Sequence, residues 1–206
     1  MAKPLTRREQ VRRETVEKIL AIAREEMQEH GVAALSLGVI AKRLGMRTPS
    51  LYTYFDSKNA IYDELFRRGF LEFGRYMDER PNQDGSLHDN LLSAMSTYMR
   101  FAQENPDLYQ LMFQRPVPGF VPSEASMAVS LARLEEGRSQ FEPIFNSGEL
   151  ETDLPFEEAR DIYIALQHGL TELHLANNPE LPVGQGRFGK LVEQAVQLVL
   201  AAWQKQ

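Results

Sequence analysis

The chain has 206 residues, of which 43% are hydrophobic and 25% are charged, proportions typical of a globular protein with room for a sizeable core. It contains no cysteine, which excludes disulfide bonds, thiolate nucleophiles and cysteine-ligated metals, and no run of eighteen apolar residues that could span a membrane. The start, MAKPLTRREQ, has no apolar signal region, so the sequence predicts a protein that stays in the cytoplasm.

The net charge of −6 is divided unevenly along the chain. Residues 1–58 carry eleven Lys and Arg against seven Asp and Glu, a net charge of +4, which leaves −10 for residues 59–206. The positive charge is densest between residues 3 and 13, where five basic side chains, Arg7 and Arg8 among them, accompany one acid. Such a basic arm can lie on the phosphates or in the minor groove of DNA, and it can equally be a solvated terminus.

The first two helices are predicted from apolar residues that recur at spacings of three and four. One stripe predicts a helix over residues 7–30, which Gly31 ends because glycine readily adopts the left-handed conformation found after helices. A second helix, about two turns long, starts at Ser36, a residue type suited to the N-cap, and is stopped by Gly45.

A third helix follows, with Thr48 as its expected cap and Pro49 at the first helical position, where the missing N–H costs nothing. Leu51 and Phe55 lie one turn apart and are expected to face the core. The neighbouring side chains then face solvent, where donors at the helix N-terminus can reach base edges, while the tyrosine hydroxyls and Lys58 suit phosphate oxygens. These exposed candidates are Arg47, Thr48, Ser50, Tyr52, Thr53 and Tyr54.

A fourth, long helix starts at Ser57 and should end before Pro81. Two short helices joined by a glycine turn, both leaning on a longer first helix, form the helix-turn-helix arrangement. Residues 1–58 are therefore predicted to be a three-helix DNA-binding head. The alternative is a three-helix module that merely packs, with Tyr52 and Tyr54 as half-buried surface aromatics.

The segment LSLGVIAKRLGMRTPSLYTYFDSKNAIYDEL resembles the DNA-binding segment of the TetR family of bacterial repressors, and the resemblance covers about residues 7–65. The positions that match the family's pattern are Ile40, Ala41, Gly45, Leu51, Tyr52, Phe55 and Lys58. Four positions depart from it: Ser36 replaces the usual Thr, Met46 and Arg47 replace Val-Ser, and Tyr54 replaces the common His.

The resemblance implies a role for each site residue. Phosphates would be held by Ser36, Tyr52 and Lys58, and the major groove would be faced by Thr48, Pro49, Ser50 and Tyr54. Arg47 could make a bidentate contact to guanine or simply anchor a phosphate, so the operator sequence is not inferable.

Residues 59–206 are also helical by periodicity and are expected to form a larger effector-binding and dimerisation domain. A fifth helix should end near residue 105, DLYQLMF should form a short sixth, and a proline-rich loop should lead to a seventh that Ser123 caps and Pro143 kinks or ends. The frequent Met and Phe residues suit first a core and also an adaptable apolar cavity. The expected effector contacts are Tyr98, Phe101, Met112, Phe113, Phe120, Met127 and His168.

Within this part, FAQENPDLYQLMF together with ALQHGLTEL resembles a C-terminal domain found in one TetR subgroup named for a Trp-His-Gly motif. Gln167 stands here in the Trp position. The resemblance says little about the ligand.

The last two helices are predicted to form a dimer. From Leu191 to Trp203 the sequence LVEQAVQLVLAAW has only three polar residues, so one domain face cannot bury all of its apolar side chains. Two helices from each chain would form a four-helix bundle about a twofold axis, although they could also form the centre of a monomer. The expected interface residues are Ile162, Leu166, Gly169, Leu170, Leu173, Leu191, Ala195, Leu198, Val199 and Ala202.

One glycine-rich stretch resembles a nucleotide-binding motif. GQGRFGK, residues 184–190, fits GxGxxG and most of a phosphate-binding loop, but NNPELPV before it is not a buried strand, and Leu191 stands where a Ser or Thr would hold magnesium. His168 and Glu172 lie four residues apart and could bind a metal with a third ligand, though a packed or pocket-lining histidine is expected. The sequence shows no nucleophile elbow and no paired histidines, so neither a catalytic site, a metal nor a cofactor is expected.

The sequence thus predicts an all-α, homodimeric, sequence-specific DNA-binding transcriptional regulator. The expected activity is repression that a small apolar or amphipathic effector relieves, and the expected DNA partner is a palindromic double-stranded operator. The alternative is a helical protein–protein interaction module without DNA binding. Salt separates the two, because binding through six or more phosphates loses roughly a thousandfold in affinity between about 50 and 200 mM salt.

Overall fold

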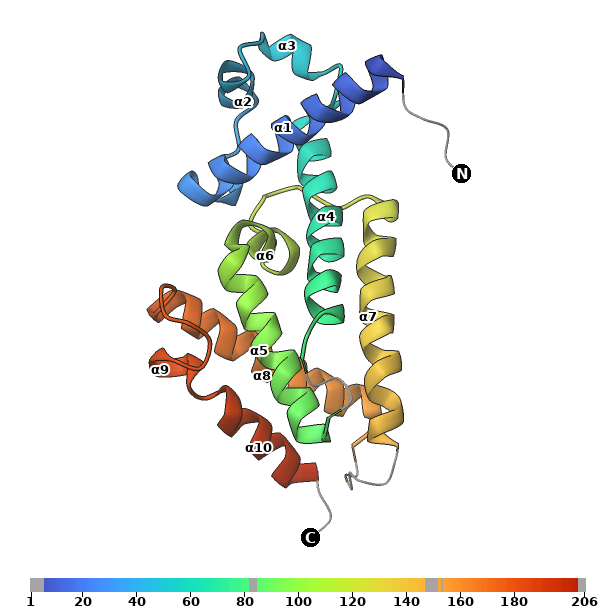
Figure 1. The fold of residues 1–206 in the computed structure, drawn as a ribbon, viewed down its shortest axis with the longest axis vertical. Helices are drawn as coiled ribbons and strands as arrows, with labels where there is room; N and C mark the ends of the chain where they lie inside the picture. Colours follow the sequence, from blue (N-terminus) through green and yellow to red (C-terminus); the bar gives the residue numbers. More distant parts are fainter. Residues whose placement is uncertain (1–5, 82–84, 147–151, 153, 204–206) are drawn as a thin grey trace. The chain divides into compact units, whose positions relative to one another are not determined.

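In the computed structural model, which describes residues 6–81, 85–146, 152 and 154–203, every regular element is a helix (Figure 1). The prediction of an all-α fold is therefore confirmed. The helices are α1 (Arg7–His30), the 3₁₀ turn η1 (Val32–Ala34), α2 (Leu37–Arg43), α3 (Thr48–Leu51), α4 (Lys58–Asp78), α5 (Leu87–Glu104), α6 (Pro106–Phe113), α7 (Glu124–Phe145), α8 (Phe156–Asn177), α9 (Gly186–Gly189) and α10 (Val192–Trp203). None of these described helices is long and apolar enough to cross a membrane.

The helices form two compact units, and neither is continuous in sequence. The first unit comprises Met1–Gly69 and Pro106–Ala128, and the second comprises Phe70–Asn105 and Val129–Gln206. The first unit thus extends beyond the predicted head of residues 1–58, because the beginning of α4 and all of α6 belong to it.

Helix α1 spans the predicted residues 7–30 and begins with a capping box that the sequence reading did not identify. The Thr6 hydroxyl accepts a hydrogen bond from the Glu9 amide (3.3 Å), and the Glu9 carboxylate accepts one from the Thr6 amide (2.7 Å). At the other end Gly31 has a φ of 89°, which favours glycine, and its amide donates to the Met27 carbonyl. These contacts fix both ends of the helix on which the short helices lie.

The next two helices are short, and α2, with seven residues, has the two turns that were predicted. Ser36 occupies the N-cap of α2, although its side chain makes no capping hydrogen bond there, and α2 ends at Arg43 before Gly45, whose φ is 67°. The predicted cap of α3 was wrong by one position: Arg47 is the N-cap, so Thr48 is the first helical residue and Pro49 the second. Proline is tolerated there because the amides of a helix's first turn have no intrahelical partner.

Helices α4 and α6 complete the first unit around α1. The hydroxyl of Tyr62, a fully buried residue of α4, donates to the Val32 carbonyl at 2.7 Å. Asp107 of α6 has a fully buried side chain and accepts from Arg24 Nε (2.7 Å), Arg24 Nη2 (3.0 Å) and Gln28 Nε2 (2.9 Å) on α1. These bonds satisfy the buried carboxylate, which would otherwise be costly to desolvate.

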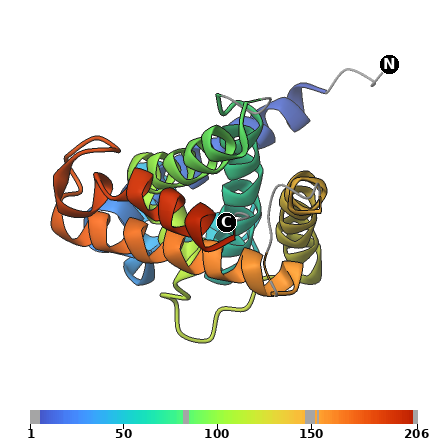
Figure 2. The same cartoon turned by 90° about the horizontal axis from the view of Figure 1, so that it is seen from below.

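In the second unit, α5, α8 and α10 pack together around one apolar cluster. Figure 2 shows α10 lying alongside α8. The cluster includes Met95 and Met99 of α5, Tyr163 of α8, and Val196 and Trp203 of α10. The fifth helix ends at Glu104 as expected, and Ser123 caps α7 through the Ser126 amide, but α7 continues through Pro143 to Phe145.

Candidate nucleic-acid interface

The first candidate site is the short recognition segment formed by α3 and the turn that follows it. Leu51 is almost completely buried and anchors the segment, while Phe55 is only half-buried. The side chains predicted to read DNA all reach the surface: Thr48 and Tyr54 are half-buried, and the exposed ones are Arg47, Pro49, Ser50, Tyr52 and Thr53. The segment therefore presents polar and aromatic groups on the side opposite its anchor.

After only four residues of α-helix the chain continues as tight turns. The amides of Tyr52 and Thr53 donate to the carbonyls three residues before them at 3.3 Å, and the Tyr54 amide donates to Leu51 O at 2.8 Å. The Thr53 hydroxyl also donates to Ser50 O at 2.8 Å. Local hydrogen bonds thus define the backbone, but their 3.3 Å lengths make this end less firmly held than a regular helix.

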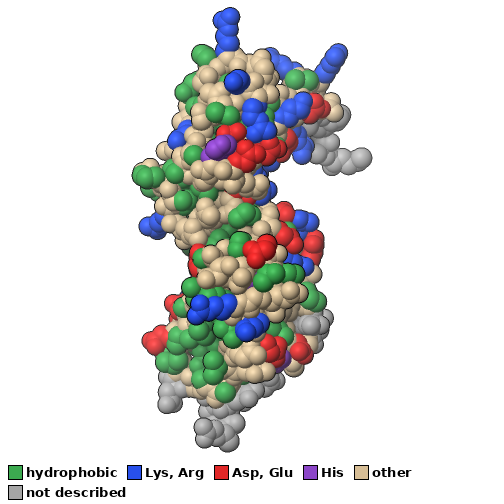
Figure 3. Space-filling view, turned by 90° about the vertical axis from the view of Figure 1, so that its left-hand side faces the viewer, with side chains coloured by type: hydrophobic (Ala, Val, Ile, Leu, Met, Phe, Trp, Pro, Cys, Tyr) green, Lys and Arg blue, Asp and Glu red, His purple; other side chains and the backbone are tan. Residues whose placement is uncertain are grey.

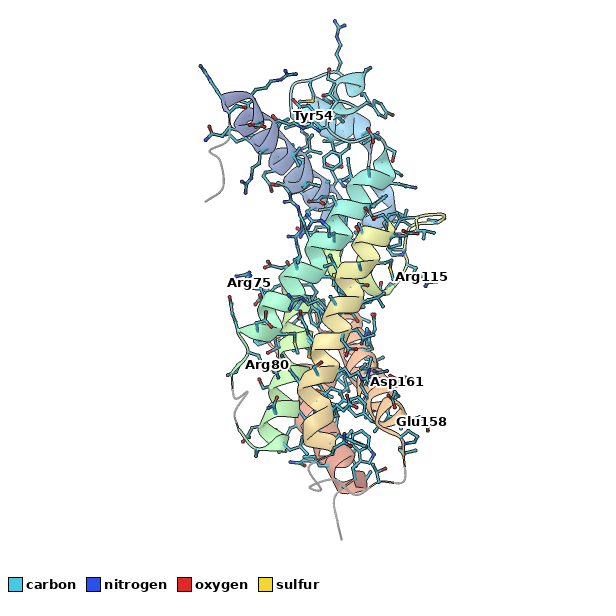
Figure 4. The ribbon with its side chains drawn as sticks, turned by 90° about the vertical axis from the view of Figure 1, so that its right-hand side faces the viewer. Tyr54, Arg75, Arg80, Arg115, Glu158 and Asp161 are labelled. Carbon is cyan, nitrogen blue, oxygen red and sulfur yellow. The ribbon has the colours of Figure 1, made fainter. Side chains whose placement is uncertain are left out.

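Helix α1 supports the recognition segment through Arg12, a residue that was not among the predicted site residues. Arg12 Nη1 donates to the carbonyl oxygen of Thr53 at 2.6 Å, and the guanidinium carbon lies 5.5 Å from the centroid of the Tyr54 ring. Figure 4 shows Tyr54 on the side of the α2–α3 segment that faces α1. Arg12 and Thr53 are 41 residues apart in the sequence, so no local sequence pattern predicts this contact.

Lys58 and Ser36 lie at the starts of two helices. Lys58 is the first residue of α4 and its Nζ lies 5.7 Å from the centroid of the Tyr62 ring, while the neighbouring Ser57 hydroxyl accepts from the Ala60 amide at 3.1 Å. Ser36 is half-buried at the N-cap of α2. The amides of a first helical turn and a nearby cation are both suited to an anion.

Arg7 and Arg8 lie in the first turn of α1, and Lys3 of the predicted basic arm lies outside the described residues. Both arginines are exposed. Cations are unfavourable at a helix N-terminus, where the backbone dipole is already positive, so the stability of α1 does not account for them. They raise the positive potential at this end of the helix.

Several acidic side chains of the first unit pair with arginines. Glu17 of α1 pairs with Arg68 of α4 at 2.8 Å, and hydrogen bonds from Arg68 lower the pKa of Glu17, which keeps it ionised. Arg43 of α2 pairs with Glu25 and Glu26. Within the described part of the chain, by contrast, Arg7, Arg8, Arg47 and Lys58 form no salt bridge, and Figure 3 shows Lys and Arg side chains projecting from this unit. The positive charge is thus concentrated at the recognition segment and the start of α1.

The predicted effector residues divide between the two units. In the second unit the Tyr98 hydroxyl lies 2.9 Å from His168 Nδ1, and Phe73 contacts the rings of both Tyr98 and Phe101. Burial lowers the pKa of His168, an effect that Glu172 opposes. The structure therefore brings three of the seven predicted residues, Tyr98, Phe101 and His168, into one aromatic cluster.

The other four belong to the first unit. Met112 packs against Gly69, where an added Cβ would come within 2.5 Å of the Met112 sulfur. Phe120 contacts the ring of Tyr62 at a centroid distance of 5.6 Å, and Phe113 contacts that of Tyr109 at 5.4 Å. Met127 on α7 is 38% exposed. Most of these side chains thus contribute to packing in their own unit.

The predicted dimer residues fall into two groups. Ala195 and Val199 are buried in the protomer's own core, because α10 turns that face toward α5 and α8; Leu170 packs partly against the same cluster. The prediction is therefore corrected for Ala195 and Val199, which belong to the core of the chain and are not available to a partner. The residues that remain exposed are Ile162, Leu166, Gly169 and Leu173 on α8, Leu191 just before α10, and Leu198 and Ala202 on α10.

The glycine-rich stretch 184–190 has a structural explanation. Gly184 and Gly186 have φ values of 85° and 71°, which few other residues adopt. An added Cβ at Gly189 would come within 2.9 Å of the ring of His174, a fully buried histidine of α8 that the sequence reading did not single out. The glycines let the α9 segment pack closely on α8, and no strand precedes them between residues 154 and 183.

One group of side chains in the described ranges could hold a metal ion, and it does not include the pair His168 and Glu172 considered above. The ligand atoms of Glu26, Glu29 and His30 all lie within 4.8 Å of one another at the end of α1. Arg43 Nη1 already lies 3.3 Å from the Glu26 carboxylate, so one of the three possible ligands is paired with the Arg43 guanidinium. His168 and Glu172 are joined by no third ligand among the residues that the structure describes.

Residues 19–65, which include α2, α3 and the start of α4, match the family model described as bacterial regulatory proteins, tetR family. The HTH-type transcriptional regulator Rv1816 of Mycobacterium tuberculosis is 29% identical over 111 residues, 52% of this chain and 47% of that protein. The HTH-type transcriptional repressor KstR2 of Rhodococcus jostii is 40% identical over 63 residues, 30% of each chain. The chain spans about half the length of Rv1816, so the likeness concerns that part alone.

Solved structures show the same fold over nearly the whole chain. The putative regulatory protein SCO4313 superimposes with a TM-score of 0.71 at 23% identity, covering 95% of this chain and 100% of that one. The fatty acid degradation regulator FadR of Bacillus halodurans superimposes with a TM-score of 0.69 at 16% identity, covering 96% and 97%. Residues 19–65 thus match the helix-turn-helix segment of the tetR family of bacterial regulatory proteins, and the all-helical fold of the chain is similar to those of SCO4313 and FadR.

Proposed function

We propose that this protein is a sequence-specific DNA-binding transcriptional regulator, and that it acts as a repressor. The observation that carries the proposal is the recognition segment, in which a buried Leu51 holds Arg47, Ser50 and Tyr52 outward within a tetR-family helix-turn-helix. A helix presented in this way fits the major groove, where each base pair has a distinct pattern of donors and acceptors.

In this proposal one set of side chains reads base edges and another set binds phosphates. Arg47 and Tyr54 would contact base edges together with Thr48, Pro49 and Ser50, whereas Ser36, Tyr52 and Lys58 would hold phosphates. The position of Lys58 at the start of a 21-residue helix supports its role, since the helix amides and the ammonium both attract an anion. Arg7 and Arg8 would add backbone contacts from the first turn of α1.

Two copies of the chain would pair through the exposed apolar residues of α8 and α10. Leu198 is 71% exposed, and Ile162, Leu166 and Leu173 form a stripe on α8 at helical spacing. Apolar side chains repeated along a helix face are normally covered, and a twofold axis lets the same face cover itself. A dimer whose recognition helices lie about 34 Å apart would read a palindrome in successive major grooves.

A small apolar or amphipathic molecule would release the repressor from its operator. The aromatic cluster of Phe73, Tyr98 and Phe101 supports an apolar ligand, and the part-buried Tyr98–His168 pair could orient a polar group on it. Such a ligand acts only by preferring one conformation, and moving a population from about 1:99 to 99:1 needs about 5.5 kcal/mol of differential affinity. The functional division into a head of residues 1–58 and a body of residues 59–206 belongs to this proposal.

The proposal is tested by selecting duplexes from a random library and measuring binding to the selected sequence at several salt concentrations. Arg47→Ala and Tyr54→Ala should change which base pairs are preferred, whereas Lys58→Ala should weaken all sequences about equally and lower the salt dependence by about one ion. Arg115→Ala is the control, because Arg115 is an exposed arginine after α6, away from the recognition segment. If the wild-type protein enriched no sequence, the proposal would fail.

A further inference from the structure

The contact between Arg12 and the end of the recognition segment has no role in the function proposed above. Arg12 lies on α1, yet its guanidinium makes two contacts with consecutive residues of the segment: a hydrogen bond of 2.6 Å to Thr53 O, and a position 5.5 Å from the Tyr54 ring centroid. Both distances lie in the range of direct interaction. One side chain of the supporting helix thus holds both the backbone and the side chain at the point where the segment reads DNA.

The recognition segment needs such support from outside. Its α-helix ends at Leu51, and residues 52–54 are held locally by turn hydrogen bonds of which two are 3.3 Å long. The Thr53 carbonyl lies just beyond the last helical turn, where carbonyls have no intrahelical partner, and Arg12 provides a charged donor for it. The Tyr54 side chain is half-buried, and the Arg12 guanidinium over its ring further restricts its two side-chain torsions.

The geometry also leaves Tyr54 able to contact DNA. A cation placed over an aromatic face interacts with the ring, and the hydroxyl, which lies in the ring plane at its far end, stays available. A side chain that is already ordered loses less entropy on binding and presents its hydroxyl in one direction. Arginine suits this task better than lysine because its planar guanidinium can stack on the ring while an N–H group donates to a carbonyl.

We propose that Arg12 is a positioning residue that determines specificity by fixing Tyr54 for base reading, and that it is not primarily a phosphate contact. The inference rests on the proposed function, because it requires that the protein read DNA sequence. It extends that function by assigning part of the base preference to a residue outside the helix-turn-helix.

The test compares the base preferences of the full-length wild type with those of Arg12→Ala and Tyr54→Ala, selected from the same randomised duplex library. Arg12→Ala should relax the preference at the base pairs that Tyr54→Ala also relaxes, with an affinity loss for the selected duplex of roughly tenfold, or about 1.4 kcal/mol. In the Tyr54→Ala background, Arg12→Ala should change the base preference no further, because the side chain that it positions is already missing.

Two further variants control for charge and folding. Arg13→Ala removes an equally exposed arginine from the next position of α1 and should leave the base preference unchanged. Arg12→Lys keeps the charge but not the planar group, so it should relax the same base pairs with a smaller loss of affinity. Arg12 is exposed, so folding should survive either change; circular dichroism checks this, and Arg12→Lys decides the question if Arg12→Ala does not fold.

The inference is overturned if Arg12→Ala weakens all duplexes equally and lowers the salt dependence by about one ion, the behaviour of a phosphate contact. It is equally overturned if either Arg12 variant keeps the wild-type preference. These outcomes differ from a failure of the proposed function, in which the wild type itself would select no sequence.

Discussion

Asp107 shows at the level of a single residue how the first unit is held together. Its carboxylate is fully buried and accepts three hydrogen bonds from Arg24 and Gln28. Removing one partner of a buried ion pair leaves the other charge without compensation. The pair therefore affects stability mainly because removing one partner would leave an uncompensated charge at a buried site.

We expect Asp107→Ala to lower the free energy of unfolding by about 3 kcal/mol, because Arg24 would lose its partner at a largely buried site. Urea denaturation followed by circular dichroism measures the change. The matched control is Glu72→Ala, which breaks an exposed pair with Arg75 and should cost less than about 1 kcal/mol. Equal losses in the two variants would contradict this interpretation.

His168 makes the stability of the second unit depend on pH. Burial lowers its pKa from the ordinary value of 6.5, so the unfolded chain binds a proton more readily than the folded one. The stability contributed by the neutral ring is therefore fully present above about pH 6.5 and is lost as the pH falls through that value toward the lowered pKa of the folded state.

His168→Gln should remove this part of the pH dependence, because glutamine does not titrate. Urea unfolding at a series of pH values between about 5 and 8 measures it, as the slope of stability against pH reports the difference in bound protons. A His168→Gln protein with the same slope as the wild type would show that another group is responsible.

Contacts between distant residues mark the limit of what the sequence could predict. Leu51 as an anchor and the exposed residues around it follow from helical spacing, and the structure places them accordingly. Arg12 and Thr53 are 41 residues apart, and Arg24 and Asp107 are 83 apart. No local pattern encodes such a pairing, so these contacts became visible only in the folded structure, although Thr53 itself was a predicted site residue.

At the scale of the element, the bounds of α1 and α6 follow from the sequence, whereas the cap of α3 and the internal face of α10 do not. Helix α1 has the predicted bounds because its apolar stripe repeats over several turns and glycine follows it. Helix α3 has four residues and its cap is Arg47, since a helix this short is determined by tertiary packing more than by its own sequence. Helix α10 is apolar on most sides, so its sequence alone could not tell the face that packs internally, with Ala195 and Val199, from the face that stays exposed.

Two glycine-to-alanine substitutions, one where α9 packs on α8 and one in α7, should have opposite effects on the free energy of unfolding. Gly189→Ala would place a Cβ 2.9 Å from the ring of buried His174, and this overpacking should lower the free energy of unfolding by about 1–3 kcal/mol. Gly137→Ala, in α7, meets no atom within 4 Å and should raise it by about 0.5–1 kcal/mol, because alanine favours a helix interior. Thermal or urea unfolding measures both, and a stabilised Gly189→Ala protein would rule out the tight contact.

At the scale of the whole molecule, the exposed face of α8 and α10 predicts the state of association. Leu198→Glu should give a monomer near 23.6 kDa, whereas the wild type is expected to sediment as a species of twice that mass, because a charge would be buried at the proposed twofold contact. Sedimentation at micromolar concentration measures it. Leu198 suits this test better than Leu170, which packs partly against the core of its own protomer.

Leu131→Glu is the matched control for the dimer. Leu131 is 57% exposed on α7, outside the proposed contact, so its substitution should leave the association state unchanged. The variant Leu198→Glu should also lose binding to the selected palindrome while Ser36, Tyr52 and Lys58 remain in place. A wild-type protein that sediments near 23.6 kDa would remove both the dimer and the palindromic operator.

The hydrogen bonds between Asp107 and α1 have a practical consequence for anyone who wishes to exchange DNA specificities between regulators. A graft cut at residue 58 would leave Arg24 and Gln28 without the Asp107 carboxylate, and the Val32 carbonyl without the Tyr62 hydroxyl. A functional chimera should therefore contain residues 1–69 together with residues 106–128. These two segments are separate in the sequence but belong to one compact unit.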